Sequence, residues 1–246
     1  MKKNILITGS SRGIGKAIAY KFAENNFDVI LHCGKNQAEA LKTLEELKQN
    51  FSGNHCLMMA DLKNISNIKN MFLDIQKQYG KLDVVINNAG TTKFIPHRQF
   101  DDLTEDIFDE IYAVNLKAAF YCSTQAVKLM SESSDANIIN IASIAATTGN
   151  GSNIAYCALK AGLVNMTKSM ARALGPNIRV NSISPGLIET DLTRNWKEYA
   201  DEQISKASLK KLSTAKDIAE AAFSLCTQLK MVTGHDLIVD GGRVIN

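Results

Sequence analysis

A tyrosine and a lysine lie four residues apart in the second half of the chain, at Tyr156 and Lys160. The segment from Ile154 to about Leu174 has a helical pattern, so the two side chains share one helix face. A nearby ammonium group favours a phenolate, and Lys160 is therefore expected to lower the pKa of Tyr156 from its ordinary value of about 10. Such a pair can give a proton to a substrate oxygen and take one back in the reverse reaction.

A serine supports this interpretation by its position. Ser143 comes directly after the apolar run Ile138–Ile141, which reads as a buried strand. In open α/β sheets, ligands bind at the carboxyl ends of the strands. The sequence therefore places Ser143 at the edge of a sheet where a ligand would bind.

The elements that must position these residues are short apolar runs that alternate with longer segments of helical period. Ile14, Ile18 and Phe22 recur every four residues, and Leu41, Leu44 and Leu47 mark a second helix. This alternation predicts an α/β fold: a Rossmann-type, doubly wound parallel sheet of about seven strands, with helices on both faces. The predicted strands contain Ile5–Ile7, Val29–Leu31, Cys56–Met59, Leu82–Ile86, Ile138–Ile141, Ile178–Ile183 and Leu237–Val239.

The length of 246 residues suits one catalytic domain over residues 1–246. No repeat, low-complexity tract or Pro/Gly linker interrupts the chain. A polar stretch at about 189–208 breaks the alternation late in the sequence. In an α/β enzyme such a stretch is a candidate substrate lid, and a plain surface helix is the alternative.

Composition and charge limit the kinds of partner that the protein is expected to bind and indicate its cellular compartment. A formal net charge of +3 is too small to indicate nucleic-acid or membrane binding, and the paired lysines at 2–3 and 210–211 read as solvated surface. The first apolar run is too short for a signal peptide, and no stretch is long enough to span a membrane. Dispersed histidines and five scattered cysteines predict no metal site and a cytoplasmic location. The cysteines are Cys33, Cys56, Cys122, Cys157 and Cys226.

A glycine-rich loop follows the first predicted strand and leads into a helix. It runs from Thr8 to Gly15. Gly9 allows a tight turn, Gly13 allows a ligand to approach the backbone, and Gly15 lets the helix pack against the strand. A strand, loop and helix in this order bring backbone N–H groups and the positive end of the helix to a pyrophosphate. The unit therefore predicts nucleotide binding.

The spacing TGxxxGxG differs from the GxGxxG of larger dehydrogenases and resembles the short-chain dehydrogenase/reductase family. Asn87–Gly90 matches the NNAG element of that family, Asp61-Leu62 its adenine-contacting position, and Pro185–Thr190 its PG-x-I-x-T segment, where Ile188 and Thr190 would face the nicotinamide carboxamide. The matches continue to Asp240–Gly242, so the resemblance covers nearly the whole chain. The cofactor-binding residues that it implies are Gly9, Ser11, Arg12, Gly13, Ile14, Gly15, Lys35, Asp61, Leu62, Asn88, Ala89, Gly90, Tyr156, Lys160, Pro185, Gly186, Ile188 and Thr190.

The resemblance extends to four catalytic positions. Ser143 lies thirteen residues before Tyr156, as in the family's Ser…Tyr-x-x-x-Lys arrangement, and Asn115 on the preceding helix matches the fourth position. The resemblance implies that Tyr156 donates the proton while Ser143 hydrogen-bonds the substrate oxygen and stabilises its developing charge. Lys160 would hold ribose hydroxyls and tune Tyr156, and Asn115 would hold a water that connects Lys160 to solvent.

The end of the second strand predicts which nicotinamide cofactor binds. An NAD site places a carboxylate there to accept from the ribose 2′-hydroxyl, but the sequence reads His32-Cys33-Gly34-Lys35. Arg12 and Lys35 are placed to supply the cations that a 2′-phosphate needs. We therefore predict NADPH/NADP+ as the cofactor.

Within the family, the chain is most similar to the 3-oxoacyl-[acyl-carrier-protein] reductases of fatty acid biosynthesis. Lys128 and Arg172 match two basic positions of their docking surface for an acidic carrier protein. The segment 131–137 carries no base, however, and the loop at 174–177 is short. An acyl-carrier-linked carbonyl and another small ketone, sugar or hydroxy acid therefore both remain open as substrates. A non-catalytic cofactor-binding scaffold on the same fold is a third alternative.

The resemblance also implies an oligomer, a homotetramer or a homodimer. The predicted helices at 112–130 and 154–174 carry many small residues that could form such an interface. Ordinary packing against the sheet could use the same residues.

Overall fold

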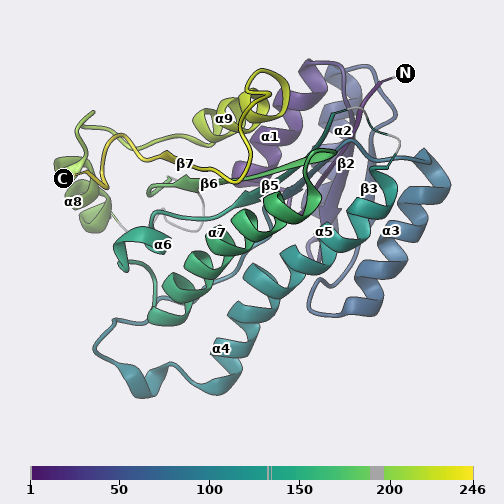
Figure 1. Ribbon diagram of the computed structural model, residues 1–246. Coiled ribbons are helices and arrows are strands. Elements are labelled where there is room, and N and C mark those ends of the chain that lie inside the picture. The colour runs from purple at the N-terminus through teal and green to yellow at the C-terminus, as the bar shows by residue number, and fades with distance from the viewer. Residues whose placement is uncertain (1, 132, 134, 189–196, 246) are drawn as a thin grey trace.

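The computed structural model describes residues 2–131, 133, 135–188 and 197–245. In this part of the chain, seven parallel strands form one sheet in the order β3-β2-β1-β4-β5-β6-β7 (Figure 1). This is the doubly wound α/β fold that the alternating sequence pattern predicts. The strands are β1 (Asn4–Ile7), β2 (Asp28–Cys33), β3 (Cys56–Met59), β4 (Val84–Asn87), β5 (Ala136–Ile141), β6 (Ile178–Pro185) and β7 (Asp236–Val239).

The helices cover both faces of the sheet. One face carries α1 (Gly13–Glu24), α2 (Gln37–Asn50) and α9 (Ala215–Thr227), and the other carries α3 (Ile65–Tyr79), α5 (Ala118–Leu129) and α7 (Ile154–Leu174). Alternate strand residues enter opposite cores, because successive side chains of a strand point to opposite faces. Ile5 and Ile7 contact the first group, and Leu6 contacts the second. Burial of each such side chain contributes about 1.5–3 kcal/mol.

The predicted strands are present with small differences at their ends. β4 begins at Val84 rather than Leu82, and the side chain of the preceding Asp83 accepts the backbone N–H of Asn4 at 2.8 Å. The two edge strands are only partly buried, and Met59 at the end of β3 is 42% exposed. Edge strands lack a neighbour on one side, and the sequence pattern did not reveal this difference.

The region between β4 and α7 contains the irregular turns that shape the site. A 3₁₀ turn at Phe100–Asp102 precedes α4 (Glu105–Tyr112), and a π-helical turn at Ala113–Lys117 joins α4 to α5. The sequence predicted one helix from 112 to 130. The short helix α6 (Ala145–Thr148) follows β5 and leads to α7.

The candidate lid at 189–208 falls partly outside the described residues, which omit 189–196. Its second part contains α8 (Lys197–Lys206), which lies beside the C-terminal segment (Figure 1). The backbone N–H of Leu209 donates to the carbonyl of Gly241 at 2.9 Å, which joins the end of this stretch to that segment.

The described residues contain neither a membrane-spanning helix nor a metal-binding cluster. None of the helices they form is both long and apolar enough to cross a membrane. In the same residues, no three His, Cys, Asp or Glu side chains gather in a way that could hold a metal ion.

Candidate active site

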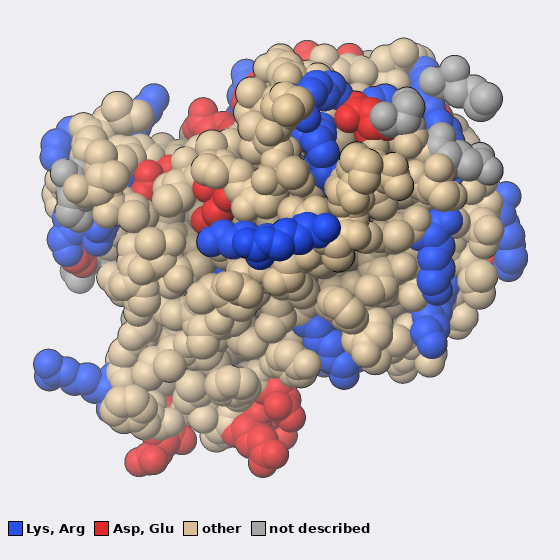
Figure 2. All heavy atoms as spheres, viewed as in Figure 1, with Lys and Arg blue, Asp and Glu red and all other residues tan. Residues whose placement is uncertain are grey.

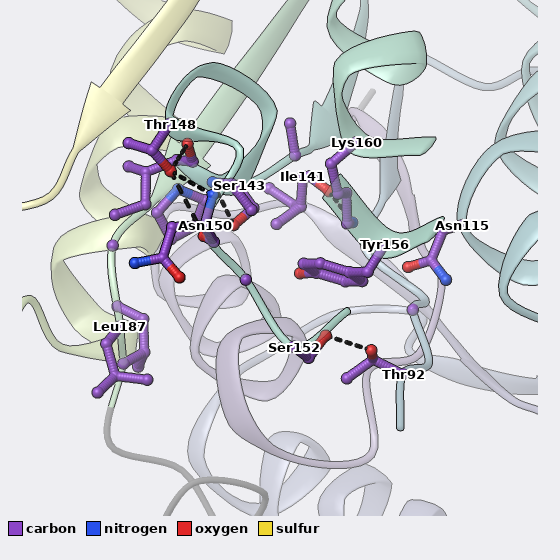
Figure 3. A pocket seen from close by; sticks show the side chains of 18 of the residues that line it. Thr92, Asn115, Ile141, Ser143, Thr148, Asn150, Ser152, Tyr156, Lys160 and Leu187 are labelled. Atoms are coloured by element: carbon purple, nitrogen blue, oxygen red, sulfur yellow. Dashed lines mark hydrogen bonds between the residues drawn. The ribbon is translucent and has the colours of Figure 1, made fainter. Parts of the chain in front are cut away.

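The four predicted catalytic residues lie around one cavity of about 390 Å³. Asn115 comes from the π-helical turn, Ser143 from the end of β5, and Tyr156 and Lys160 from the first turns of α7. Figure 3 shows the ring of Tyr156 between Ser143 and Asn115, with Lys160 on the same helix. Segments that are far apart in the sequence thus bring these side chains to the carboxyl ends of the central strands.

The start of α7 is positioned by Asn153, which sequence reasoning did not identify. Its side-chain oxygen accepts the backbone N–H of Tyr156 at 2.7 Å, as an N-cap residue does. Its amide nitrogen donates to the carbonyl of Lys93 at 2.7 Å and to Thr92. Asn153 therefore ties the catalytic helix to the loop after β4.

The surroundings of Tyr156 act on its pKa in opposite directions. Burial raises the pKa above its ordinary value, the hydrogen bond with Ser143 lowers it, and Cys157 adds a smaller increase. The net effect is a raised pKa, whereas the sequence predicted that Lys160 would lower it. The ammonium of Lys160 lies 5.6 Å from the centre of the Tyr156 ring, over its face rather than beside its hydroxyl.

Lys160 is only 4% exposed. Its Nζ donates a hydrogen bond to the carbonyl of Ile141 at 2.8 Å, which orients the ammonium at the end of β5. Burial disfavours the charged form and lowers the pKa of Lys160 to about 8. The side chain can therefore lose its proton slightly above neutral pH.

Ser143 is held at the point where β5 becomes α6. Its hydroxyl oxygen accepts the backbone N–H of Ala145 at 3.1 Å. The next residue, Ile144, donates its N–H to the carbonyl of Pro185 at 3.0 Å. With one N–H already accepted, the hydroxyl hydrogen of Ser143 can point to Tyr156 or to a substrate oxygen.

Asn115 is 2% exposed and connects three segments. Its amide nitrogen donates to the carbonyls of Thr91 at 2.7 Å and Ile111 at 2.9 Å. Its side-chain oxygen has no hydrogen-bond partner in the described part of the chain, and a Cβ atom at Gly90 would lie 2.9 Å from it. A buried acceptor of this kind is where a bound water is expected.

The glycine-rich loop has the geometry that close approach of a ligand requires. Gly9 has φ of +63°, a left-handed conformation that favours glycine. A Cβ atom at Gly15 would lie 2.5 Å from the carbonyl oxygen of Gly9, so a side chain there would break the loop. Gly13 begins α1, whose first backbone N–H groups are available to an anion.

Asn88, in the loop after β4, connects that loop to the glycine-rich loop through hydrogen bonds. Its amide nitrogen donates to the carbonyls of Thr8 at 2.9 Å and Gly9 at 2.8 Å. The hydroxyl of Thr8 accepts the backbone N–H groups of Asn88 and Ala89, both at 3.0 Å. The polar atoms of the Asn88 side chain thus hold the glycine-rich loop in place, while Asn88 and Gly90 also line the cavity.

His32 is a second residue whose role the sequence did not indicate. Its side chain is 2% exposed; Nδ1 accepts the N–H of Gly9 at 3.0 Å, and Nε2 lies 3.0 Å from the carbonyl of Ala60. Burial lowers the pKa of His32 to about 4, and the bond to Ala60 opposes this only partly. The neutral ring therefore connects the glycine-rich loop to the turn that contains Asp61.

The remaining predicted cofactor residues surround this framework. Arg12 and Lys35 are exposed, and no described residue forms an ion pair or a hydrogen bond with either side chain. The carbonyl of Ser11 accepts the hydroxyl of Thr43 at 2.8 Å. Asp61 is half-buried and Leu62 is buried.

At the other side of the site, the cavity wall includes Ile14, Pro185, Gly186 and Ile188. The N–H of Gly186 donates to the carbonyl of Val239 at 3.0 Å, and Ile188 forms a bridge with Ser213. These contacts hold the turn after β6 in the cavity wall. The predicted residue Thr190 lies outside the described residues.

Two further lining residues, Gln203 and Arg243, were not among the predicted site residues, although Gln203 lies in the candidate lid at 189–208. They come from α8 and from the C-terminal segment, and neither belongs to a recognisable local motif. Thr92 and Ser152 also line the cavity and are hydrogen-bonded to each other (Figure 3). Only the folded chain brings these residues to Tyr156.

The chain is similar to known proteins over nearly its whole length. Residues 9–243 match a family model described as enoyl-(acyl carrier protein) reductase. The chain is 33% identical to the 3-oxoacyl-[acyl-carrier-protein] reductase FabG of Staphylococcus aureus (strain N315), over 98% of both chains. It is 32% identical to FabG of Chlamydia pneumoniae, over 98% of this chain and 96% of the other.

A solved variant of a Serratia marcescens short-chain dehydrogenase/reductase superimposes with a TM-score of 0.91, at 28% identity over 98% of both chains. The fold and the site define an oxidoreductase of CH–OH and C=O groups that binds a nicotinamide cofactor. The chain belongs to the short-chain dehydrogenase/reductase family.

Proposed function

We propose that the chain is an NADPH-dependent carbonyl reductase whose substrate is a 3-oxoacyl thioester. One observation carries this proposal: Asn115, Ser143, Tyr156 and Lys160 line a single cavity. The same cavity is lined by Ile14, Asn88, Gly90 and Ile188, which belong to the predicted cofactor site. A proton donor and a cofactor-binding wall therefore face the same space.

In the proposed reaction, the substrate carbonyl oxygen lies between the hydroxyls of Ser143 and Tyr156. Ser143 donates a hydrogen bond that stabilises negative charge developing on this oxygen, and Tyr156 donates the proton. Nicotinamide, when bound, supplies the hydride. Lys160 holds ribose hydroxyls and favours the phenolate of Tyr156 after proton transfer. Asn115 holds the water through which the proton is replaced.

The preference for NADPH is supported by the shape and charge of the loop region. The left-handed Gly9 and the crowded Gly15 keep side chains away from the backbone N–H groups that a pyrophosphate would contact. Arg12 and Lys35 are exposed cations, and no carboxylate ends β2. We expect the Arg12→Ala, Lys35→Ala double variant to raise the KM for NADPH while changing the KM for NADH little. A wild-type preference for NADH, or an unchanged KM for NADPH in this variant, would contradict the assignment.

The 3-oxoacyl thioester is supported by the FabG relatives, which span nearly the whole chain. Two bases of a carrier-docking surface are present and exposed: Lys128 on α5 and Arg172 on α7. Arg172 lies sixteen residues after Tyr156 on one helix, which corresponds to about 24 Å along its axis. A carrier protein bound at Arg172 must therefore deliver its acyl group over that distance, or dock elsewhere.

The second candidate substrate is a small carbonyl compound that is not attached to a carrier protein. The surface charge favours it, since acidic residues gather near the lower edge of the molecule in Figure 2 and would repel an acidic carrier. Residues 101–110 include Asp101, Asp102, Glu105, Asp106, Asp109 and Glu110, in the 3₁₀ turn and α4. This segment follows the cavity-lining Phe94 by a few residues. Like charges repel, so an acidic carrier is disfavoured on this side.

The proposal is tested by adding the acetoacetyl thioester of coenzyme A or of acyl carrier protein to the enzyme and NADPH. The rate of reduction is measured as the loss of NADPH absorbance. A clear preference for the carrier-linked compound supports the fatty-acid role. Failure on both, with turnover of small ketones or sugars, contradicts the thioester and favours the second candidate. Cofactor binding without turnover on any carbonyl would instead indicate a non-catalytic protein.

A further inference from the structure

The loop between α6 and α7 presents one amide side chain to the catalytic cavity. Asn150 lies in this loop, is exposed, and belongs to the cavity lining. In the part of the chain that the structure describes, only its backbone N–H and carbonyl form hydrogen bonds, and its side-chain amide forms none. Figure 3 shows this amide directed away from Thr148 and toward the open space beside Leu187. Both its N–H groups and its oxygen can therefore reach a ligand.

Asparagine is common in turns for two structural reasons, and neither applies to Asn150. Its side chain often bonds to nearby backbone, and it tolerates a left-handed conformation. Here the hydroxyl of Thr148 makes the local bonds, because it donates to the carbonyl of Ile144 at 3.0 Å and accepts the N–H of Asn150 at 3.2 Å. The left-handed residue of the turn is Gly149, with φ of +63°. The turn is thus built without the amide of Asn150.

The backbone on both sides of Asn150 is held in place. Thr148 fixes the preceding side through the bonds just described. On the following side, the carbonyl oxygen of Gly151 lies 3.2 Å from Nε2 of His97, and a Cβ atom at Gly151 would lie 2.9 Å from the sulfur of Cys157. A side chain on such a fixed backbone loses less conformational freedom when it binds a ligand, which favours recognition.

The burial of the lining residues indicates which part of a substrate Asn150 would contact. Lys160 is buried, Ser143 and Tyr156 are half-buried, and Asn150 is exposed. Asn150 is therefore nearer to the mouth of the cavity than the two hydroxyls that are proposed to hold the ketone oxygen. The part of the substrate that leads from its ketone toward solvent then lies within reach of this amide.

The chemistry of the wall indicates what that part of the substrate is. The described lining of the cavity includes no aspartate or glutamate, and apolar side chains such as Ile144 and Leu187 form much of it. The neutral amide of Asn150 both donates and accepts hydrogen bonds, so it suits a neutral ligand group with the same two properties. The secondary amides of a pantetheine arm have both, whereas an alkyl chain has neither.

We propose that Asn150 binds an amide of the pantetheine arm of a 3-oxoacyl thioester and thereby determines specificity for thioesters of this kind. This inference rests on the proposed function and deepens it, since it names the part of the thioester that is recognised. Coenzyme A and acyl carrier protein carry the same arm, and the comparison of their acetoacetyl thioesters described above identifies which of them presents it.

The test compares two acetoacetyl thioesters that share the reacting group. The thioester of N-acetylcysteamine carries the first amide of the arm, and that of 1-pentanethiol has a similar length and no amide. Asn150→Leu removes the amide at nearly constant side-chain size. We expect kcat/KM for the N-acetylcysteamine thioester to fall about 3–10-fold, the loss of one hydrogen bond, whereas the pentyl thioester should lose no more than about twofold. Asn70→Leu on α3, exposed and outside the cavity lining, is the control and should change neither value.

Equal falls for the two thioesters, or no fall for either, would overturn the role of Asn150, and melting temperatures verify that the variants fold. A binding measurement separates this inference from the proposed function. The NADPH complex is titrated calorimetrically with the butyryl thioesters of the same two thiols, which have no ketone to reduce. Tighter binding of the N-acetylcysteamine compound by the wild type, lost in Asn150→Leu, supports the contact even if neither acetoacetyl thioester is reduced. Equal binding of both compounds by the wild type, or a preference that the variant retains, would refute it.

Discussion

At the scale of single residues, the chemistry of the site depends on how burial acts on two titratable groups. Burial raises the pKa of Tyr156 and lowers that of Lys160, because it disfavours the charged form of each. The bond with Ser143 partly offsets the change at Tyr156. A protonated tyrosine suits the donation of a proton to a carbonyl. The reverse reaction requires the phenolate, and we propose that the Lys160 ammonium favours it once cofactor and substrate are bound.

The first prediction concerns the proton donor. Tyr156→Phe removes the hydroxyl and leaves the ring, so turnover should fall by about 10²–10⁴-fold, as expected for the loss of a general acid. Binding of NADPH, followed by fluorescence titration, should change little. Tyr112→Phe on α4 is the matched control, since its ring is 41% exposed and outside the cavity lining. Near-normal turnover of the Tyr156 variant would refute the assignment.

The second prediction concerns pH. The pKa of Lys160 is lowered to about 8, so its ammonium is present below this pH and lost as the pH rises through it. Since the ammonium is proposed to hold ribose hydroxyls and to tune Tyr156, kcat/KM for NADPH should fall above about pH 8. This parameter reports groups of the free enzyme.

An arginine does not lose its proton in this range, so Lys160→Arg should shift or abolish the high-pH fall even if its overall activity is lower. A wild-type profile that stays flat to pH 10 would contradict the prediction. So would an identical fall in the variant.

At the scale of elements, the cofactor side of the site depends on contacts between neighbouring strand ends. The ends of β1, β2 and β3 lie side by side in the sheet, and His32 at β2 bonds to Gly9 after β1 and to Ala60 after β3. Ser10 strengthens the same junction through its N–H, which donates to the carbonyl of His32 at 3.0 Å. The shape of the glycine-rich loop is therefore set partly by the second strand.

The third prediction tests this junction. His32→Leu keeps a buried side chain of similar size but loses both ring hydrogen bonds, so the N–H of Gly9 loses its acceptor. We expect the Kd for NADPH to rise about 5–20-fold, the equivalent of about 1–2 kcal/mol, while kcat at saturating cofactor changes little. His235→Ala, at an exposed position before β7, is the control. A fall in kcat without a change in the Kd for NADPH would contradict the role of His32 in shaping the cofactor loop.

At the scale of the whole molecule, Asp135 joins segments from both ends of the chain. It forms ion pairs with Lys3 before β1 at 2.9 Å, with Arg179 of β6 at 3.4 Å, and with Lys230 after α9. Burial acts to raise the pKa of Asp135, but the bonds from Lys230 and Lys3 outweigh it and lower the pKa to about 2. The carboxylate therefore contributes to stability in the folded chain.

The fourth prediction concerns this contribution. Because the folded pKa of Asp135 lies below its ordinary value of 3.8, the stabilisation is present above about pH 4 and lost as the pH falls toward 2. Asp135→Asn should lower the free energy of unfolding by about 1–3 kcal/mol at pH 7, and the difference from wild type should shrink in acid. Urea unfolding at several pH values measures it. The exposed Asp74→Asn is the control, and an equal difference at pH 7 and pH 2 would contradict the assignment.

The fifth prediction concerns assembly, and we propose a homo-oligomer, a tetramer or a dimer. Phe108 and Tyr112 on α4 and Phe120 on α5 are each 41–42% exposed, which leaves apolar surface that association could cover. Light scattering should therefore report a mass two or four times that of one chain. Phe120→Glu should shift the distribution to smaller species if this face takes part. A monomeric mass for the wild type would refute the proposed assembly.

Much of the fold follows from the sequence because its signals are local. A run such as Ile138–Ile141 must be buried, and its length suits a strand. Ile18 and Phe22 share one helix face through their spacing alone, and both are fully buried. The glycines of the loop after β1 and the spacing from Ser143 to Lys160 are equally local. These patterns were sufficient to predict the sheet and the loop, and the resemblance to the family pointed to the four residues that line the cavity.

The tertiary structure alone decided the features that depend on contacts between distant segments. The raised pKa of Tyr156 depends on how deeply the folded chain buries its ring, and no spacing in the sequence reports burial. His32 accepts a hydrogen bond from Gly9, 23 residues earlier, and Arg243 orients Gln203 across forty residues. A side chain's partners are set by the order of strands in the sheet and by the packing of α8 on the C-terminal segment. The sequence by itself therefore determined which chemistry the chain carries, and the folded structure decided which further residues surround it.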